Sequence, residues 1–193
     1  DGVWLALPTT TEQVQAALRQ IGISSDNPQG LFISGYFAEE EKRFAIPYNM
    51  VLASNVDELN FLASRLETLS TGERAELNAA LQAPQSELFS IGRITDFPEN
   101  VDYYVHLPDV HGPAQLGDYY LNRSGMVDMP EEWKGGIDTA QFGRYVAQQE
   151  QGVFTEYGYL VKSGDAWQKV HEGQPVPEEY RVLSFPAPDR KST

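Results

Sequence analysis

The first helix of the chain is predicted by its apolar spacing. Apolar residues recur every three or four positions at Val14, Ala17, Leu18 and Ile21. This spacing places them on one face of a helix. Thr9, followed three residues later by Glu12, predicts a capping box at the start, and Gly22 predicts the end.

Three segments around this helix are rich in β-branched and aromatic residues, a composition that favours strands. They are residues 3–7, 31–37 and 43–48. The charged run from residue 39 to 43 predicts a solvated hairpin turn. Residues 1–53 are therefore predicted to form a small α+β domain.

The next segment follows the helical period throughout. One apolar stripe consists of Leu59, Leu62, Ala63 and Leu66. Ser54 with Asp57, and Ser70 with Glu73, match the capping-box pattern at the starts of two helices. Residues 54–95 are predicted to form a helical domain.

Mixed structure returns in residues 96–162. The pattern predicts strands over 101–106 and 153–161 and a helix over 113–122. A further helix begins at Asp138, with Gln141 in the third helical position, and ends at Gly152. Four prolines and two glycines predict a loosely ordered tail over residues 163–193.

The charge of the chain is strongly negative. Its 193 residues include 28 Asp plus Glu against 14 Lys plus Arg, for a net charge of −14. Residues 96–160 alone carry eleven acids and three bases, or −8. Such a field favours basic partners and disfavours direct binding to nucleic acid or anionic lipid.

No apolar run reaches the roughly 18–20 residues of a membrane span, and the start DGVWLALP lacks the features of a secretory signal. The chain contains no cysteine, which excludes disulfides and fits a reducing compartment. We therefore expect a cytoplasmic protein.

Motifs for catalysis are absent. The chain has no nucleophile elbow, Walker loop, dinucleotide fingerprint or HExxH helix. His106 and His111 are five residues apart, but no further ligands mark a metal site. Paired carboxylates such as Glu131 with Glu132, or Asp138 with Glu150, fit general acid–base work, although 28 acids produce such pairs by chance. A carboxylate-dependent hydrolase stays an alternative, and no catalytic residue, metal or cofactor is predicted.

The acids are spaced along folding sequence rather than clustered in a tail. Aromatic and aliphatic residues accompany them, so the carboxylates are expected to be fixed in place. Fixed carboxylates at phosphate-like separations can occupy a basic nucleic-acid groove. Charge alone favours the simpler interpretation, an ordinary acidic protein, because acidity chiefly reports solubility.

The chain resembles the ArdA antirestriction family over about residues 3–162. The family's C-terminal signature is similar to PEEWKGGIDTAQFGRYVAQQEQGVFTEYGYL, with an Ile-Asp pair, the step Phe142-Gly143-Arg144 and a strand from Phe154 to Tyr159. Its N-terminal strand and helix are similar to VWLALPTTTEQVQAALRQIGI. Its central helix pair is similar to DELNFLASRLETLSTGERAELNAAL, and LGDYYLNRSG resembles the helix before the signature.

The resemblance implies an elongated α+β protein of three small domains with a short Pro-rich tail. The domains would be residues 1–53, 54–95 and 96–162. It also implies a cytoplasmic homodimer that mimics B-form DNA and inhibits type I restriction-modification enzymes at the DNA groove of their methyltransferase core. It implies no reaction, no cofactor and no binding to DNA or membrane. A generic acidic interaction module of a mobile element stays an alternative.

The resemblance and the charge pattern together give two sets of candidate residues. The carboxylates predicted to face the enzyme are Asp57, Glu58, Asp96, Glu99, Asp102, Asp109, Asp118, Asp128, Glu131, Glu132, Asp138, Glu150 and Glu156. The signature residues predicted to build a core or dimer contact are Phe142, Gly143, Arg144, Tyr145, Phe154 and Tyr159.

Overall fold

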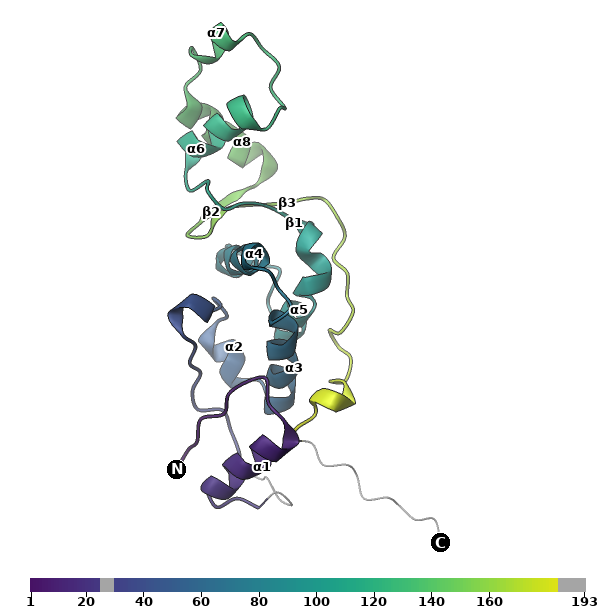
Figure 1. Ribbon diagram of the computed structural model, residues 1–193. Coiled ribbons are helices and arrows are strands. Elements are labelled where there is room, and N and C mark those ends of the chain that lie inside the picture. The colour runs from purple at the N-terminus through teal and green to yellow at the C-terminus, as the bar shows by residue number, and fades with distance from the viewer. Residues whose placement is uncertain (25–29, 184–193) are drawn as a thin grey trace.

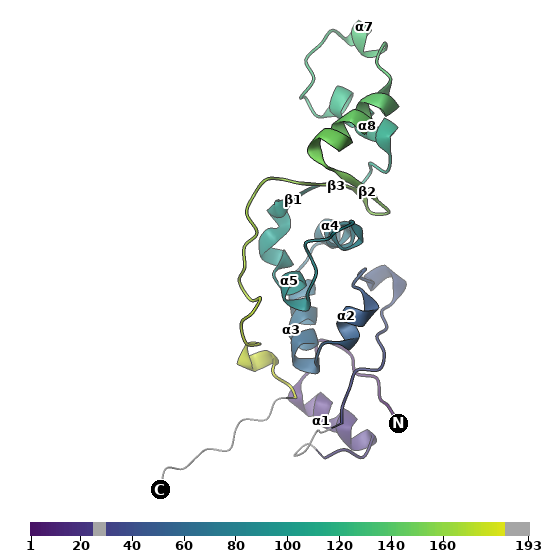
Figure 2. The same ribbon diagram turned by 180° about the vertical axis from the view of Figure 1, so that it is seen from behind.

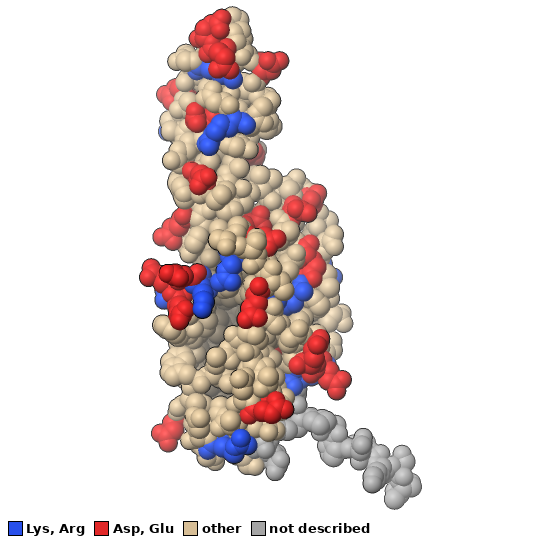
Figure 3. Space-filling view, in the orientation of Figure 1, with Lys and Arg blue, Asp and Glu red and all other residues tan. Residues whose placement is uncertain are grey.

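The computed structural model describes residues 1–24 and 30–183 and has an α+β fold of helices with one small antiparallel sheet. The molecule is elongated, with α1 at one end and α7 at the other (Figures 1 and 2). The space-filling view in Figure 3 has the same outline. We call residues 1–47 the lower region, residues 48–103 the middle region, residues 104–162 the upper lobe and residues 163–183 the strap.

The regular elements of the lower and middle regions, within the described residues, are all helices. Their elements are α1 (Thr11–Gln20), η1 (Glu40–Lys42), α2 (Tyr48–Leu52), α3 (Val56–Leu66), α4 (Thr71–Gln82), α5 (Ile91–Thr95) and η2 (Phe97–Tyr103). The upper lobe and the strap add β1 (Tyr104–Leu107), α6 (Pro113–Asp118), η3 (Tyr119–Arg123), α7 (Glu131–Lys134), α8 (Thr139–Glu150), β2 (Val153–Thr155), β3 (Gly158–Lys162) and η4 (Glu178–Tyr180).

The strands predicted over residues 3–7, 31–37 and 43–48 are wrong, since these residues form no strand. Buried asparagines of the helices take the place of strand partners. Asn78 in α4 accepts the Ala45 N–H at 2.7 Å and donates to the Arg43 carbonyl at 3.3 Å. The predicted hairpin turn is the 3₁₀ turn η1. Side chains of helices, not a sheet, therefore hold the extended chain of the lower region.

Capping explains where the longer helices begin. The capping box at Ser70 and Glu73 is confirmed. Two other starts lie one residue later than predicted. Thr10, not Thr9, caps α1, and Asn55, not Ser54, caps α3. At both helices, the predicted and the observed capping residue each have a side chain that can accept a free N–H of the first turn. The sequence pattern therefore locates the helix more reliably than it locates the first residue of the helix.

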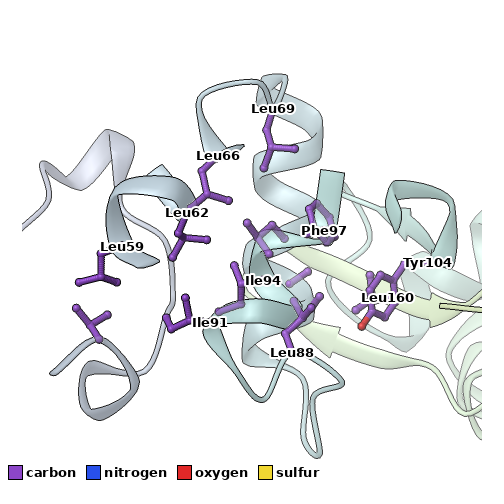
Figure 4. Close-up of a cluster of buried hydrophobic side chains, with 14 residues drawn as sticks. Leu59, Leu62, Leu66, Leu69, Leu88, Ile91, Ile94, Phe97, Tyr104 and Leu160 are labelled. Carbon is purple, nitrogen blue, oxygen red and sulfur yellow. The ribbon is translucent and has the colours of Figure 1, made fainter. Parts of the chain in front are cut away.

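The main hydrophobic core lies in the middle region. Its side chains come from α2, α3, α4, α5, η2, the loops on either side of α4, and strands β1 and β3, and they point toward one another in Figure 4. Val51, Leu77 and Leu160 belong to this one core, although each comes from a different predicted domain. The predicted division into three domains stays a prediction.

The sheet closes the base of the upper lobe with the strand order β1-β3-β2. The strand predicted over 153–161 is a hairpin, because Thr155 pairs with Gly158 and the chain reverses between them. Gly158 has φ +110°, which a residue with a side chain rarely adopts. The strand predicted over 101–106 begins only at Tyr104, after η2.

The strap returns from β3 along the side of the middle region to α1, as both ribbon views show (Figures 1 and 2). It is held by hydrogen bonds from Gln168 to Leu183. The expectation of a loosely ordered tail is therefore wrong for residues 163–183, and residues 184–193 lie outside the described part. In the ranges 1–24 and 30–183, no helix is long and apolar enough to cross a membrane.

Candidate partner-binding surface

Ten of the thirteen predicted carboxylates are exposed. They lie on elements of the middle region and the upper lobe, and Figure 3 shows acidic side chains scattered from one end of the molecule to the other. They are Glu58, Glu99, Asp102, Asp109, Asp118, Asp128, Glu131, Glu132, Asp138 and Glu156. The surface therefore presents dispersed negative charge and not one acidic cluster.

Asp96 does not belong to this surface, which corrects the sequence prediction. It is completely buried, and its carboxylate accepts the N–H groups of Val170, His171 and Glu172 at 2.7–3.1 Å. Asp57 is half-buried and accepts the N–H groups of Val182 and Leu183 at 2.8 and 2.9 Å. Both carboxylates hold the strap, so their negative charge serves backbone amides of the same chain.

Glu150 is half-buried at the end of α8 and is also engaged internally. The Tyr120 hydroxyl donates to both of its oxygens at 3.0 and 2.9 Å, and the Tyr159 hydroxyl donates to one. Burial, followed by the hydrogen bond to Glu150, raises the pKa of both tyrosines. This carboxylate ties α8 to η3 and β3, so it has fewer free lone pairs for a partner than an exposed acid.

Several exposed acids have partners within the protein. Asp118 pairs with Arg123 at 3.7 Å, Glu131 with Lys134 at 2.8 Å, and Glu99 with Arg65. Asp138 caps α8 by accepting the N–H groups of Ala140 and Gln141, as predicted, and Glu156 accepts from Gln82. Among the described residues, four of the exposed predicted acids form neither an ion pair nor a side-chain hydrogen bond: Asp102, Asp109, Asp128 and Glu132. Because these four side chains have no such interaction to break, they can pair with the cations of a partner at the lowest cost in free energy.

The signature residues are divided between core and surface. A Cβ on Gly143 would lie 1.7 Å from the Pro113 carbonyl oxygen, so α6 and α8 touch backbone to backbone there. Tyr159 is completely buried and packs on Phe154 with ring centroids 5.0 Å apart. Phe142 is half-buried, whereas Arg144 and Tyr145 are exposed. The signature is thus mostly a packing motif with one exposed edge.

The enzymatic and metal alternatives gain no support from the placement of their residues. Asp138 and Glu150 cap and end the same twelve-residue helix, which separates them by about 18 Å along its axis. A glycosidase pair needs roughly 5–9.5 Å. His106 Nε2 lies 2.6 Å from the Tyr157 carbonyl oxygen, and His111 is exposed.

A group with metal-ligand spacing occurs at Asp96, Glu99 and His171. The Asp96 carboxylate there already accepts the three strap amides. The adjoining recess between the strap, α3 and α5 has a volume of about 60 Å³, which corresponds to roughly two water molecules. We assign no metal or substrate to it.

Two features escaped the sequence analysis. Glu39, Glu40 and Glu41 are exposed and line a surface recess, but their run looked like an ordinary solvated turn. Met126, Trp133 and Tyr145 give the upper lobe exposed apolar side chains with 74, 67 and 60% of their surface accessible. The exposure of Met126 and Trp133 could not be predicted from apolar spacing. Neither residue lies in a helix or strand long enough to show a periodic pattern.

Comparison with known proteins identifies the family. A search of curated proteins found no match. The family model described as antirestriction protein (ArdA) matches residues 1–161, which covers the lower region, the middle region and nearly all of the upper lobe. This extent agrees with the resemblance carried by the N-terminal segment, the central helix pair and the C-terminal signature. The chain belongs to the ArdA family of antirestriction proteins.

Proposed function

We propose that the protein inhibits type I restriction-modification enzymes by occupying the DNA-binding groove of their methyltransferase core as a mimic of DNA. The observation that carries this proposal is the spread of exposed carboxylates along an elongated molecule with a net charge of −14 (Figure 3). Membership of an antirestriction family supplies the class of target. The protein itself catalyses no step in this proposal.

The physical basis is the same as that of DNA binding. Lys and Arg side chains of the groove pair with carboxylates in place of phosphates, and both surfaces release their counterions. Because many exposed charges act together, complementarity raises the association rate and the salt dependence more than the strength of any one contact. Carboxylates fixed on helices and the sheet cost less ordering than a flexible acidic tail would.

Competition with duplex DNA tests the proposal directly. We expect the protein to displace a labelled cognate duplex from a type I methyltransferase, and its affinity to fall steeply as salt rises from about 50 to 200 mM. Plating efficiency of unmodified phage on a restricting host should rise when the protein is expressed. Binding that persists beside saturating cognate DNA would contradict the proposal.

Charge-removing variants separate mimicry from catalysis. Single changes such as Asp109→Asn should weaken inhibition slightly, since one exposed ion pair is worth about 0.2–1 kcal/mol. The combined set Asp109→Asn, Asp128→Asn and Glu132→Gln should weaken it progressively, while circular dichroism stays unchanged. A matched control removes the same charge from three exposed acids of the strap, Asp165, Glu178 and Glu179. A single carboxamide change that abolished activity in folded protein would instead favour an enzyme, because losing one general acid or base costs about 100-fold or more.

We also propose that residues 97–162 carry a two-fold contact between two copies of the chain. The exposed Trp133 and Tyr145 of the upper lobe support a contact there, because Trp and Tyr are enriched at protein–protein interfaces relative to the rest of the surface. Tyr145→Ser should weaken the dimer at tens of micromolar in light scattering. Phe37→Ser is the control, since Phe37 is 71% exposed in the lower region. A strictly monomeric wild-type protein would contradict this contact.

A further inference from the structure

The core of the lower region includes a residue from the far end of the described chain. Val14 and Leu18 of α1 are 4 and 6% exposed, and the buried residue that clusters with them is Val182, itself 6% exposed. Leu183 packs against the same cluster. The strap therefore contributes to burying the apolar face of α1.

The upper part of the strap is held by Asp96, which lies between α5 and η2, and by Asn100 of η2. Asp96 accepts three consecutive backbone N–H groups of the strap. Asn100 accepts the Gln168 N–H at 2.6 Å and donates to the Gln168 carbonyl at 2.8 Å. A buried charge or amide without such partners would cost free energy. The strap is therefore stabilised by Asp96 and Asn100, and these two side chains are stabilised by the strap.

The lower part of the strap is held by α3. The Asp57 carboxylate accepts two strap amides, and Asn60 donates to the Tyr180 carbonyl at 3.1 Å. Asn60 also accepts the N–H of Thr9, the residue that precedes the cap of α1, at 2.7 Å. Phe61 adds ring contacts with His171 and Tyr180, both with centroids 4.9 Å away. One face of α3 thus holds the strap and the start of α1 together.

The region of the chain matched by the antirestriction family ends at residue 161, before the strap. We propose that the strap is an intramolecular clamp, and that α1 stays docked on the middle region only while residues 163–183 are in place. The clamp acts through the apolar contact of Val182 and the anchored amides above it. This inference stands independently of the target of the protein.

Hydrogen exchange on the full chain tests the clamp. Val182→Ser places a hydroxyl in the lower core and removes two methyl groups. We expect exchange of the α1 amides, including those of Val14 and Leu18, to accelerate at least about tenfold, because the local opening of α1 becomes easier. Amides of α8 should stay within about twofold of the wild type. Val170→Ser is the matched control, since Val170 lies in the strap but is 43% exposed, and it should leave both helices unchanged.

A second variant tests the anchors without touching the apolar core. In Asp96→Asn, the new amide group faces backbone N–H donors, so the amides of residues 170–172 should exchange at least about tenfold faster. Asp102→Asn, six residues along, removes the same charge from an exposed acid that forms no ion pair among the described residues, and it should leave them unchanged.

Four results would overturn the clamp. They are α1 amides that are unprotected in the wild type, α1 exchange unaffected by Val182→Ser, equal acceleration in α1 and α8, and protection of residues 170–172 that survives Asp96→Asn.

Discussion

The hydrophobic cores of the upper lobe and the lower region are completed in different ways. The upper lobe has its own core of Val110, Leu116, Ala147, Tyr159 and Val161, all from residues 104–162. The lower region completes its core with Val182, which the strap brings back from the other side of the molecule. The first region is built from contacts between neighbouring segments, and the second depends on a long-range return.

This difference separates two origins of stability. In the upper lobe, backbone contact between α6 and α8 leaves no room for adjustment, so its stability depends on steric fit. In the lower region, a half-buried carboxylate and a buried amide of α3 hold the start of α1 and the strap residue of its core, so its stability depends on satisfied hydrogen bonds. Substitutions should therefore destabilise the two regions by different mechanisms.

The largest expected effect is a loss of fit in the upper lobe. In Gly143→Ala, the new Cβ would lie 1.7 Å from the Pro113 oxygen and 2.8 Å from the Gly117 nitrogen. Both are backbone atoms and cannot rotate away. We expect the free energy of unfolding to fall by about 3 kcal/mol or more in urea unfolding. Gly72→Ala, whose Cβ would meet nothing within 4 Å, should be neutral or gain up to about 1 kcal/mol. Equal stability of both variants would remove the steric basis of the comparison.

A hydrogen-bond defect in the lower region should be smaller and local. Asn60→Ala removes an acceptor for Thr9 and a donor for Tyr180 from a residue that is 1% exposed. We expect a loss of about 2 kcal/mol, with faster hydrogen exchange in α1 and unchanged exchange in α8. Asn49→Ala, an exposed asparagine of α2, should have little effect. Equal changes in α1 and α8 would mean that the two regions open as one unit.

The stability of the middle region, which lies between the lower region and the upper lobe, should depend on pH. Burial, with added repulsion from Glu73 and Asp102, raises the pKa of Glu76 in α4 from 4.5 to about 8. The folded protein then binds more protons than the unfolded chain between these values. The stability from protonated Glu76 is fully present below pH 4.5 and is lost as pH rises through about 8.

Glu76→Gln keeps the side chain neutral, so its melting temperature should fall less than that of the wild type between pH 5 and 8.5. At pH 8.5 the variant should be more stable by on the order of 1 kcal/mol. Glu67→Gln, exposed at the end of α3, should follow the wild-type profile. Identical profiles for wild type and Glu76→Gln would show that this carboxyl does not titrate differently on unfolding.

The smallest effect concerns the hydroxyl groups on Glu150. Tyr120→Phe removes one donor but leaves the Tyr159 hydroxyl on the same carboxylate. We expect a loss of about 1 kcal/mol in urea unfolding. Tyr119→Phe is the neighbouring control, with a half-buried ring stacked under Arg123, and should cost less. A larger loss for Tyr119 than for Tyr120 would contradict the role given to Glu150.

Periodic segments were predicted well from sequence, and irregular ones were not. The apolar stripe of α3 and the capping box of α4 are local signals, and both elements formed as expected. The segment 31–37 has strand composition but forms no strand, because a sheet also requires a second segment in register, which composition does not supply. The prolines of the strap suggested disorder, whereas its order comes from side chains far away in sequence, such as Asp96 and Asn60.

For the candidate surface, the sequence predicts which acidic residues are available but not which of them are exposed. Sequence gives the number of acids and their order, and ten of thirteen are exposed. It does not distinguish Asp96 from Glu99, three residues later, although the first is buried under the strap and the second is exposed. That distinction depends on residues 170–172, whose N–H groups point at Asp96 through a contact spanning 74 to 76 positions.

The strap also determines when the lower region can become structured during synthesis. Helix α1 leaves the ribosome before the upper lobe does, but its cluster is completed only by Val182, whose amide bonds to a residue 125 positions earlier. The upper lobe, by contrast, has all of its core residues once residue 161 has emerged. Contacts over such long loops form slowly because loop closure costs entropy before any bond is made. On the ribosome, α1 emerges before the upper lobe but should become protected after it, so α1 is where a chaperone would find exposed apolar surface.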